Sequence, residues 1–163
     1  MSSLPPVDYI QRTREQYDAL GYPAYHWVYS ETPPPFTPLT KPLSACRMAL
    51  ISSGGIYREG QIAFHFKDDL SYRIIDAETP VETLRATHFA YDLTDARRDP
   101  NVVFPLHTLK KLVSNGAIGS LSANAYTFMG GIYSSRKVAS TLAPALADRL
   151  VQDEVDVVLL VPV

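Results

Sequence analysis

The sequence has a single cysteine, no long apolar run and no large excess of either charge. Cys46 alone cannot form an internal disulfide or a paired-cysteine redox or zinc motif. A net charge of −2 leaves no broad basic field for nucleic acid or an anionic membrane surface. The longest apolar run falls short of the ~20 residues of a membrane span, and the amino terminus lacks the pattern of a secretory signal. We therefore expect a cytoplasmic protein with no nucleic-acid or membrane partner.

The nucleotide-binding motifs GxGxxG and GxxxxGK[ST] are also missing. The rest of the composition is that of an ordinary globular protein, with 46% hydrophobic and 20% charged residues. A chain of 163 residues is long enough for one domain with a proper core.

Residues 1–45 predict a helix followed by a proline-rich arm. A helix over 7–21 would start after Pro5-Pro6 and stop at Gly21. Residues 22–43 contain six prolines and the only tryptophan, so we expect an extended arm. Its aromatic side chains suggest that the arm packs on its own domain or on a partner subunit. The helix would gather its apolar side chains on one face: Tyr9, Ile10, Tyr17 and Leu20.

Residues 46–163 predict an α/β domain. Strand patterns alternate with helical ones, which is typical of parallel βαβ winding. We therefore predict three layers, with a mostly parallel sheet, flanking helices and the proline-rich arm at the amino terminus. The expected strands are 47–53, 71–77, 117–123 and 155–162, and the expected helices are 104–116 and 135–154.

Three details of this domain are specific predictions. Thr79 and Pro80 would open a helical turn within 80–88. Pro144 would kink or break the last helix. The run VDVVLLVPV at 155–163 is almost continuously apolar, so we expect a strand covered on both faces, with its carboxyl end directed at the active site.

Two glycine pairs follow expected strands. Gly54-Gly55 offers either backbone donors for a ligand or a tight strand exit. Gly130-Gly131 follows Met129 within AYTFMGGIYSS, which suits either a small-molecule pocket or core packing around a turn.

The segment THFAYDLTDARRDPN at 87–101 concentrates polar side chains. His88 and Asp92 would share a face if this segment were helical, and Tyr91 lies between them. The segment suits a substrate-facing loop or a solvated loop with local caps. Because its spacing matches no zinc motif, we assign no metal. Cys46 precedes the first strand, so we expect a buried, inert thiol.

Four stretches in the same order resemble the glycine/sarcosine/betaine/D-proline reductase selenoprotein B family, and in particular the selenocysteine-containing subunit of D-proline reductase. They are TPPPFTPLTKPL at 32–43, MALISSGGIY at 48–57, the long segment 87–132, and LAPALADRLVQDEVDVVLLVPV at 142–163. One departure is Tyr57, where the family often has histidine after the glycine pair.

The resemblance implies a reductase that cleaves a C–N bond of an amino acid or related amine. A selenocysteine, or cysteine in some relatives, would directly follow Val163 and attack the substrate's α-carbon, displacing the amine. No cofactor is implied in this chain, but the resemblance implies that a pyruvoyl group on a partner subunit activates the substrate amine in the glycine and proline enzymes.

The expected nucleophile is absent, since the sequence stops at Val163. Selenocysteine is encoded by UGA, which is also a stop codon. One explanation is therefore a longer selenoprotein whose UGA codon after Val163 has been misread as a stop. The alternatives are a fragment, or a naturally short, non-catalytic homologue that binds a partner subunit or a small molecule. A missing segment would leave apolar surface uncovered and favour self-association.

We therefore expect a reductase subunit that acts on a small amine or amino acid, with another reductase subunit or a second copy as its partner. The catalytic residue would follow Val163. The substrate-binding candidates are Gly54, Gly55, His88, Tyr91, Asp92, Met129, Gly130 and Gly131.

Overall fold

The computed structural model describes residues 7–163, so the Pro5-Pro6 pair expected before the first helix lies outside the described residues. The chain divides into two compact units, Met1–Phe36 and Thr37–Val163. In the described part of the chain, none of the helices has the length and apolarity needed to cross a membrane.

The first unit is built around helix α1 (Tyr9–Ala19). Asp8 starts the helix, because its carboxylate accepts a 2.9 Å hydrogen bond from the Gln11 backbone N–H. The helix ends before Gly21, whose φ of +70° stops it as predicted. The following aromatic residues pack back on the helix. The ring contacts pair Tyr9 with Trp27 and Tyr17 with Tyr25.

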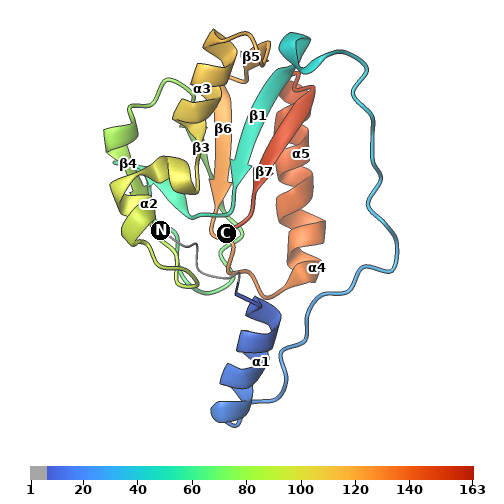
Figure 1. The fold of residues 1–163 in the computed structure, drawn as a ribbon, viewed down its shortest axis with the longest axis vertical. Helices are drawn as coiled ribbons and strands as arrows, with labels where there is room; N and C mark the ends of the chain where they lie inside the picture. Colours follow the sequence, from blue (N-terminus) through green and yellow to red (C-terminus); the bar gives the residue numbers. More distant parts are fainter. Residues whose placement is uncertain (1–6) are drawn as a thin grey trace. The chain divides into compact units, whose positions relative to one another are not determined.

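The second unit is the α/β domain, and Figure 1 shows its elements in chain order. They are β1 (Arg47–Ser52), β2 (Ile56–Arg58), β3 (Tyr72–Asp76), β4 (Leu84–Ala86), α2 (Thr94–Arg98), α3 (Leu106–Ser114), β5 (Ser120–Leu121), β6 (Asn124–Phe128), α4 (Ser135–Lys137), α5 (Ala143–Gln152) and β7 (Val157–Val161).

Strand β1 lies inside a mostly parallel sheet. β7 pairs parallel with one edge of β1, and β5 and then β6 pair parallel with its other edge. β3 closes the far side of β6 as an antiparallel strand, and β2 and β4 form a separate antiparallel pair. This arrangement confirms the predicted α/β fold with a mostly parallel sheet.

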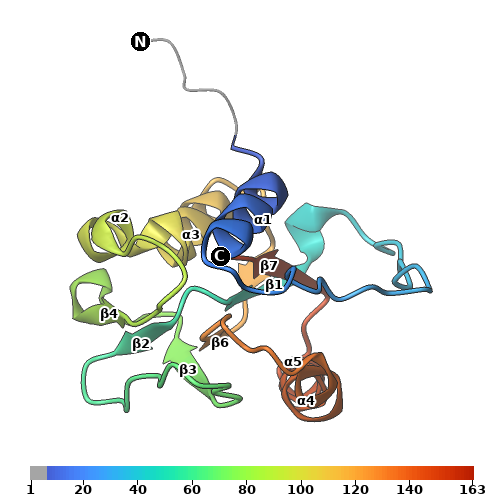
Figure 2. The ribbon, with the colours of Figure 1, turned by 90° about the horizontal axis from the view of Figure 1, so that it is seen from below.

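Helices cover both faces of the sheet, so the domain has three layers (Figure 2). Met48 and Leu50 of β1 belong to the larger core cluster, which includes the buried side of α3. Ile51 packs on the opposite face with Tyr126 and Leu146, the latter from α5. Burial on both faces explains why β1 reads as a continuous apolar run.

Two predicted elements were wrong. The strand expected over 117–123 is only Ser120–Leu121, and the longer strand β6 begins at Asn124 in a segment assigned to a loop. The helical turn expected over 80–88 is a 3-10 turn at Val81–Thr83, followed by β4. Thr79 does not cap that turn, because the turn begins one residue later than predicted, with Pro80 at the cap position. Pairing with β2 then extends the chain from Leu84 onward.

The last helix contains the predicted break at Pro144. Residues Val138–Leu142 form a π-helical turn between α4 and α5. Proline has no backbone N–H to donate to the carbonyl four residues earlier. Just before Pro144, the helical hydrogen bonds change from a spacing of four residues to a spacing of five. Ala143 accordingly donates to the Val138 carbonyl, five residues earlier.

Strand β7 confirms the expected strand but not its full burial. Val157, Leu159 and Val161 are half-buried on the side of the larger core cluster, and Val158 packs on the other face. Leu160 is 67% exposed. Within residues 7–163, β7 pairs only with β1 and is therefore an edge strand.

Candidate functional site

The carboxyl ends of β1, β6 and β7 are joined at Ser53, a residue that the sequence analysis missed. Its N–H donates to the Val161 carbonyl at 3.1 Å, and its carbonyl accepts from the Gly130 N–H at 2.9 Å. Its hydroxyl accepts a 2.9 Å hydrogen bond from the Val163 N–H. The carboxyl edge of a parallel sheet is where α/β proteins bind ligands. The only signal in the sequence was the position of Ser53 directly after β1.

The first glycine pair allows close backbone approach. Gly55 has a φ of +67°, and a Cβ there would lie 2.0 Å from the Thr87 carbonyl oxygen. Gly55 donates to the Phe128 carbonyl at 3.0 Å, and Gly54 donates to the Ser52 hydroxyl at 3.0 Å. Both N–H groups are therefore engaged inside the protein, so the predicted role as free backbone donors is wrong for this pair.

The second glycine pair makes room for neighbouring groups. The Gly130 N–H is engaged by Ser53, so it is not a free donor either. A Cβ on Gly131 would lie 2.2 Å from the Phe89 ring. Met129 is fully buried, and its sulfur accepts a 3.3 Å hydrogen bond from the Gly131 N–H.

His88 lies beside Gly55 and is 4% exposed. Its Nδ1 accepts a 3.0 Å hydrogen bond from the Ala90 N–H, which places the proton of the neutral ring on Nε2. Within residues 7–163, the buried Nε2 has no hydrogen-bond partner. Burial lowers the pKa of His88, so the neutral form predominates at neutral pH. This site therefore contains a buried donor without an acceptor.

Tyr91 connects the His88 loop to the first glycine pair. Its hydroxyl donates to the Gly54 carbonyl at 2.8 Å, and its ring lies 4.8 Å from the His88 ring. Burial raises the pKa of Tyr91, which keeps the phenol protonated. The structure thus places Gly54, Gly55, His88, Tyr91, Met129, Gly130 and Gly131 in one region.

Asp92 has a different environment. It is exposed, and its carboxylate accepts from the Thr94 N–H at 2.9 Å and the Thr94 hydroxyl at 2.7 Å, at the start of α2. These hydrogen bonds lower the pKa of Asp92. Residues 88–92 are not helical, so the shared helical face expected for His88 and Asp92 does not form.

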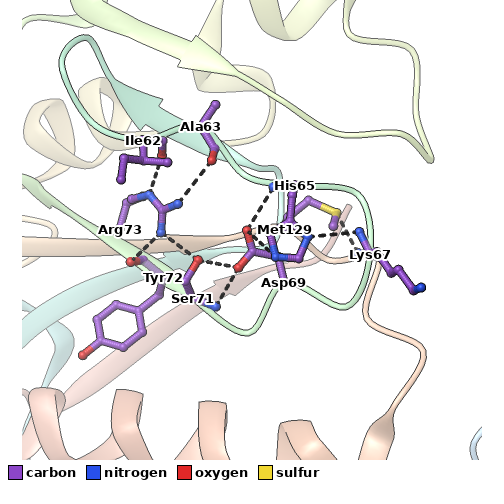
Figure 3. Close-up of polar contacts among 10 residues, drawn as sticks. Ile62, Ala63, His65, Lys67, Asp69, Ser71, Tyr72, Arg73 and Met129 are labelled. Atoms are coloured by element: carbon purple, nitrogen blue, oxygen red, sulfur yellow. Dashed lines mark hydrogen bonds and ion pairs between the residues drawn. The ribbon is translucent and has the colours of Figure 1, made fainter.

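Asp69 holds a turn that directly precedes β3, the strand that pairs with β6 (Figure 3). The Asp69 carboxylate accepts from the His65 N–H at 3.0 Å and the Ser71 N–H at 2.9 Å. Burial alone would raise the pKa of Asp69, but hydrogen bonds from Ser71 and His65 hold it below its ordinary value. Arg73 adds a 2.7 Å hydrogen bond to the Ile62 carbonyl, so this loop is well ordered by polar contacts.

The opposite end of the sheet has a hollow of about 460 Å³ lined by Asp76, Lys110 and Ser122, among others. None of the candidates predicted from the sequence lines it. In the described part of the chain, no group of three or more His, Cys, Asp or Glu side chains is arranged to hold a metal. Cys46 is fully buried, as expected, and its sulfur contacts the Pro42 carbonyl.

Comparisons with known proteins identify related chains. Residues 26–163 match the family model for glycine/sarcosine/betaine reductase selenoprotein B. D-proline reductase subunit gamma of Acetoanaerobium sticklandii is 33% identical over 130 residues, covering 79% of this chain and 54% of that protein. Sarcosine reductase complex component B subunit beta of Peptoclostridium acidaminophilum is 29% identical over 139 residues, covering 82% of this chain and 31% of that protein.

Glycine reductase complex component B subunit gamma of Symbiobacterium thermophilum is 31% identical over 137 residues, covering 81% of this chain and 31% of that protein. The chain thus spans about half the length of the first relative and about a third of the other two. No solved structure is significantly similar to it. The family match covers most of the chain and confirms the resemblance seen in the sequence, so this chain belongs to the glycine/sarcosine/betaine reductase selenoprotein B family.

Proposed function

We propose that this chain is a subunit, or the amino-terminal part, of a reductase that cleaves the C–N bond of an amino acid or related amine. The nucleophile would be a selenocysteine or cysteine. Family membership supports this proposal, and the relatives are named as D-proline, sarcosine and glycine reductase subunits. The partner would be another subunit of the same complex.

The arrangement around Ser53 is the observation that carries the proposal. Its hydroxyl holds the backbone at Val163, while its carbonyl holds Gly130 after β6. The nucleophile that the family resemblance places directly after position 163 would enter at this edge of the sheet. Ligands of open α/β sheets bind at the same edge, so substrate and nucleophile would meet there.

His88 would orient the substrate at this edge. Its ring is neutral with a proton on Nε2, and a buried donor is stabilised by a hydrogen-bond acceptor such as a substrate carboxylate. The pyruvoyl group implied by the resemblance would belong to the partner subunit and would activate the amine of glycine or D-proline from there. Replacing His88 by alanine in the active complex should raise KM, and an unchanged KM together with unchanged turnover would remove His88 from the site.

Thiol consumption by the assembled complex tests this function. Dithiothreitol should be oxidised only when a substrate is added. Glycine, sarcosine and betaine should then release ammonia or an amine, whereas the ring of D-proline should open with its nitrogen retained in the product. The 163-residue chain alone should consume no thiol. Activity of the isolated chain would overturn the nucleophile assignment. Cys46 would then be the candidate nucleophile, and the activity of Cys46→Ala would test that role.

A non-catalytic subunit that binds its partner through β7 is the second candidate. The 67% exposure of Leu160 on an edge strand favours it, because exposed edge strands pair readily with another chain. In that case the complex would form but would consume no thiol with any of the four substrates.

A further inference from the structure

Five aromatic rings form a continuous row in the first unit. The side chains of this aromatic row are, in order of contact, Tyr9, Trp27, Tyr25, Tyr17 and Tyr22. Neighbouring rings meet edge to face, with 4.6–6.0 Å between centroids. Tyr9, Trp27 and Tyr22 are 65, 49 and 59% exposed, so ring surface remains open to solvent. Open tyrosine and tryptophan surface is typical of a contact between proteins.

Helix α1 contributes two of these rings and has little packing to stabilise it. The helix has 11 residues, and none of them is buried. A helix of this length is only marginally stable in water unless its side chains pack against another surface. The family match begins at residue 26, so α1 lies outside the matched segment. A partner that covers the aromatic row would therefore stabilise a feature that the family match does not include.

The same unit contains a segment suited to aromatic surfaces. This ETPPPF segment, residues 31–36, is exposed throughout, and Phe36 is 90% exposed. Proline fixes its own φ and keeps the preceding residue extended, so three consecutive prolines favour a polyproline II conformation. Such segments dock on aromatic-lined surfaces, because little conformational entropy is lost on binding. Each copy of the chain therefore carries both an aromatic surface and a segment that such a surface binds.

The charges around the two features are also complementary. Arg12 and Arg14 lie on opposite sides of the helix face that carries the two rings of α1. Glu31 carries the only charge of residues 27–40. Within residues 7–163, none of these three side chains forms an ion pair. Glu31 of one copy can therefore pair with an arginine of another copy and orient the segment on the rings.

We propose that two copies of this chain exchange their ETPPPF segments, so that the segment of each copy packs on the aromatic row of the other. The two contacts are identical and reciprocal, so they close a twofold dimer and leave neither aromatic row uncovered. Phe36 is the side chain that gains most burial in each contact, since it is the most exposed of the large apolar residues. None of the residues in this contact belongs to the candidate site, so the proposal does not depend on the proposed function.

Two variants that cannot dimerise alone test the exchange when they are mixed. Trp27→Ala removes a ring from the aromatic row and keeps the segment, whereas Phe36→Ala alters the segment and keeps the row. Both are made in the Leu160→Lys chain, which removes association through β7. In sedimentation velocity, each variant should dimerise at least about tenfold more weakly than the Leu160→Lys parent.

The mixture of the two variants should form more dimer than either variant alone. One of the two contacts is intact in the mixed dimer, because the segment of Trp27→Ala meets the complete aromatic row of Phe36→Ala. No gain of dimer on mixing would overturn the exchange. A parent chain that stays monomeric would also overturn it and would leave the aromatic row to another subunit.

Trp27 reports directly on the same mixture, because it is the only tryptophan of the chain. Only the Phe36→Ala copy then contains tryptophan, and its emission should move to shorter wavelength, with saturation, as Trp27→Ala is added. The matched control is the double variant Trp27→Ala/Phe36→Ala, which supplies no intact segment and should leave the emission unchanged. An equal change with the double variant would show unspecific apolar contact and would overturn the exchange.

Charge substitutions test the exchange without altering any ring. Glu31→Arg should weaken the dimer of the Leu160→Lys chain roughly two- to fivefold, as expected for an exposed ion pair. Adding Arg12→Glu and Arg14→Glu should restore it, because the charges of the two sides are then exchanged. These substitutions keep the exchange testable even where an aromatic variant fails to fold. A dimer unaffected by Glu31→Arg, or not restored in the combined variant, would contradict the exchange.

Discussion

The phenol of Tyr126 donates a 2.6 Å hydrogen bond to the carboxylate of Asp153, which joins β6 to the turn that follows α5. The Ser122 hydroxyl and the Asn124 side chain donate to the same carboxylate at 3.0 and 3.2 Å. Tyr126 is fully buried, and burial together with the Asp153 contact raises its pKa. The phenol therefore remains a donor over the physiological pH range.

Replacing Tyr126 by phenylalanine should lower the free energy of unfolding by about 1.5–3 kcal/mol, as expected for a hydrogen bond to a charged group. Urea denaturation of the 163-residue chain measures the difference. Tyr29→Phe, at an 84% exposed tyrosine, is the control and should change stability little. A loss below about 0.5 kcal/mol for Tyr126→Phe would show that the other donors satisfy Asp153 without it.

Replacing Gly55 by alanine should disrupt the candidate site. The added Cβ would meet the Thr87 carbonyl oxygen at 2.0 Å in a backbone with φ of +67°, so the chain must move. Gly116→Ala is the matched control, because its φ is +73° but nothing lies within 4 Å of the new Cβ. We expect a cost of about 1–2 kcal/mol at Gly116 and clearly more at Gly55. Equal shifts in thermal unfolding would contradict the clash.

His88 should make stability depend on pH. Burial lowers its pKa below the ordinary 6.5, so the folded state binds fewer protons than the unfolded state between these two values. The contribution of neutral His88 to the free energy of unfolding is therefore complete above about pH 6.5, and it is lost as the pH falls toward the lowered pKa. Urea midpoints at pH 7.5 and 5.5 measure this slope.

His88→Gln should flatten that slope, because glutamine does not titrate. The exposed His26→Gln is the control and should keep the wild-type slope. Buried carboxylates such as Asp69 act in a lower window, since their lowered pKa values lie below 3.8. A wild-type slope retained in His88→Gln would show that another group carries the pH dependence.

The sequence predicted the elements whose signals are local. The apolar run of β1, the Gly116 stop of α3 and the break before Pro144 each depend on residues within one segment. Strand β6 was missed because Ser122 and Ala123 read as part of the preceding strand. Its own Asn124 and Thr127 are polar, yet pairing with both β1 and β3 makes it a central strand.

The sequence predicted that the candidate residues gather, but not which contacts they make. Gly54 and Gly130, placed after strands, both lie at the carboxyl edge of the sheet, but their N–H groups are engaged by Ser52 and Ser53. The aromatic contacts beside this site were not predictable, because Phe66 and Tyr133 each contact Phe89 only through loops that meet in the fold. The buried state of His88 likewise depends on packing that periodicity does not encode.

The exposed edge of β7 should promote self-association of the 163-residue chain. Leu160 is 67% exposed on a strand that pairs, within residues 7–163, only with β1. Leu160→Lys should shift the monomer–oligomer equilibrium toward monomer in sedimentation velocity, because a lysine on an edge strand opposes strand pairing. Val151→Lys is the control, since Val151 is 78% exposed on α5. If both substitutions dissociate the oligomer equally, association is driven by apolar contact over the whole surface and does not depend specifically on the edge of β7.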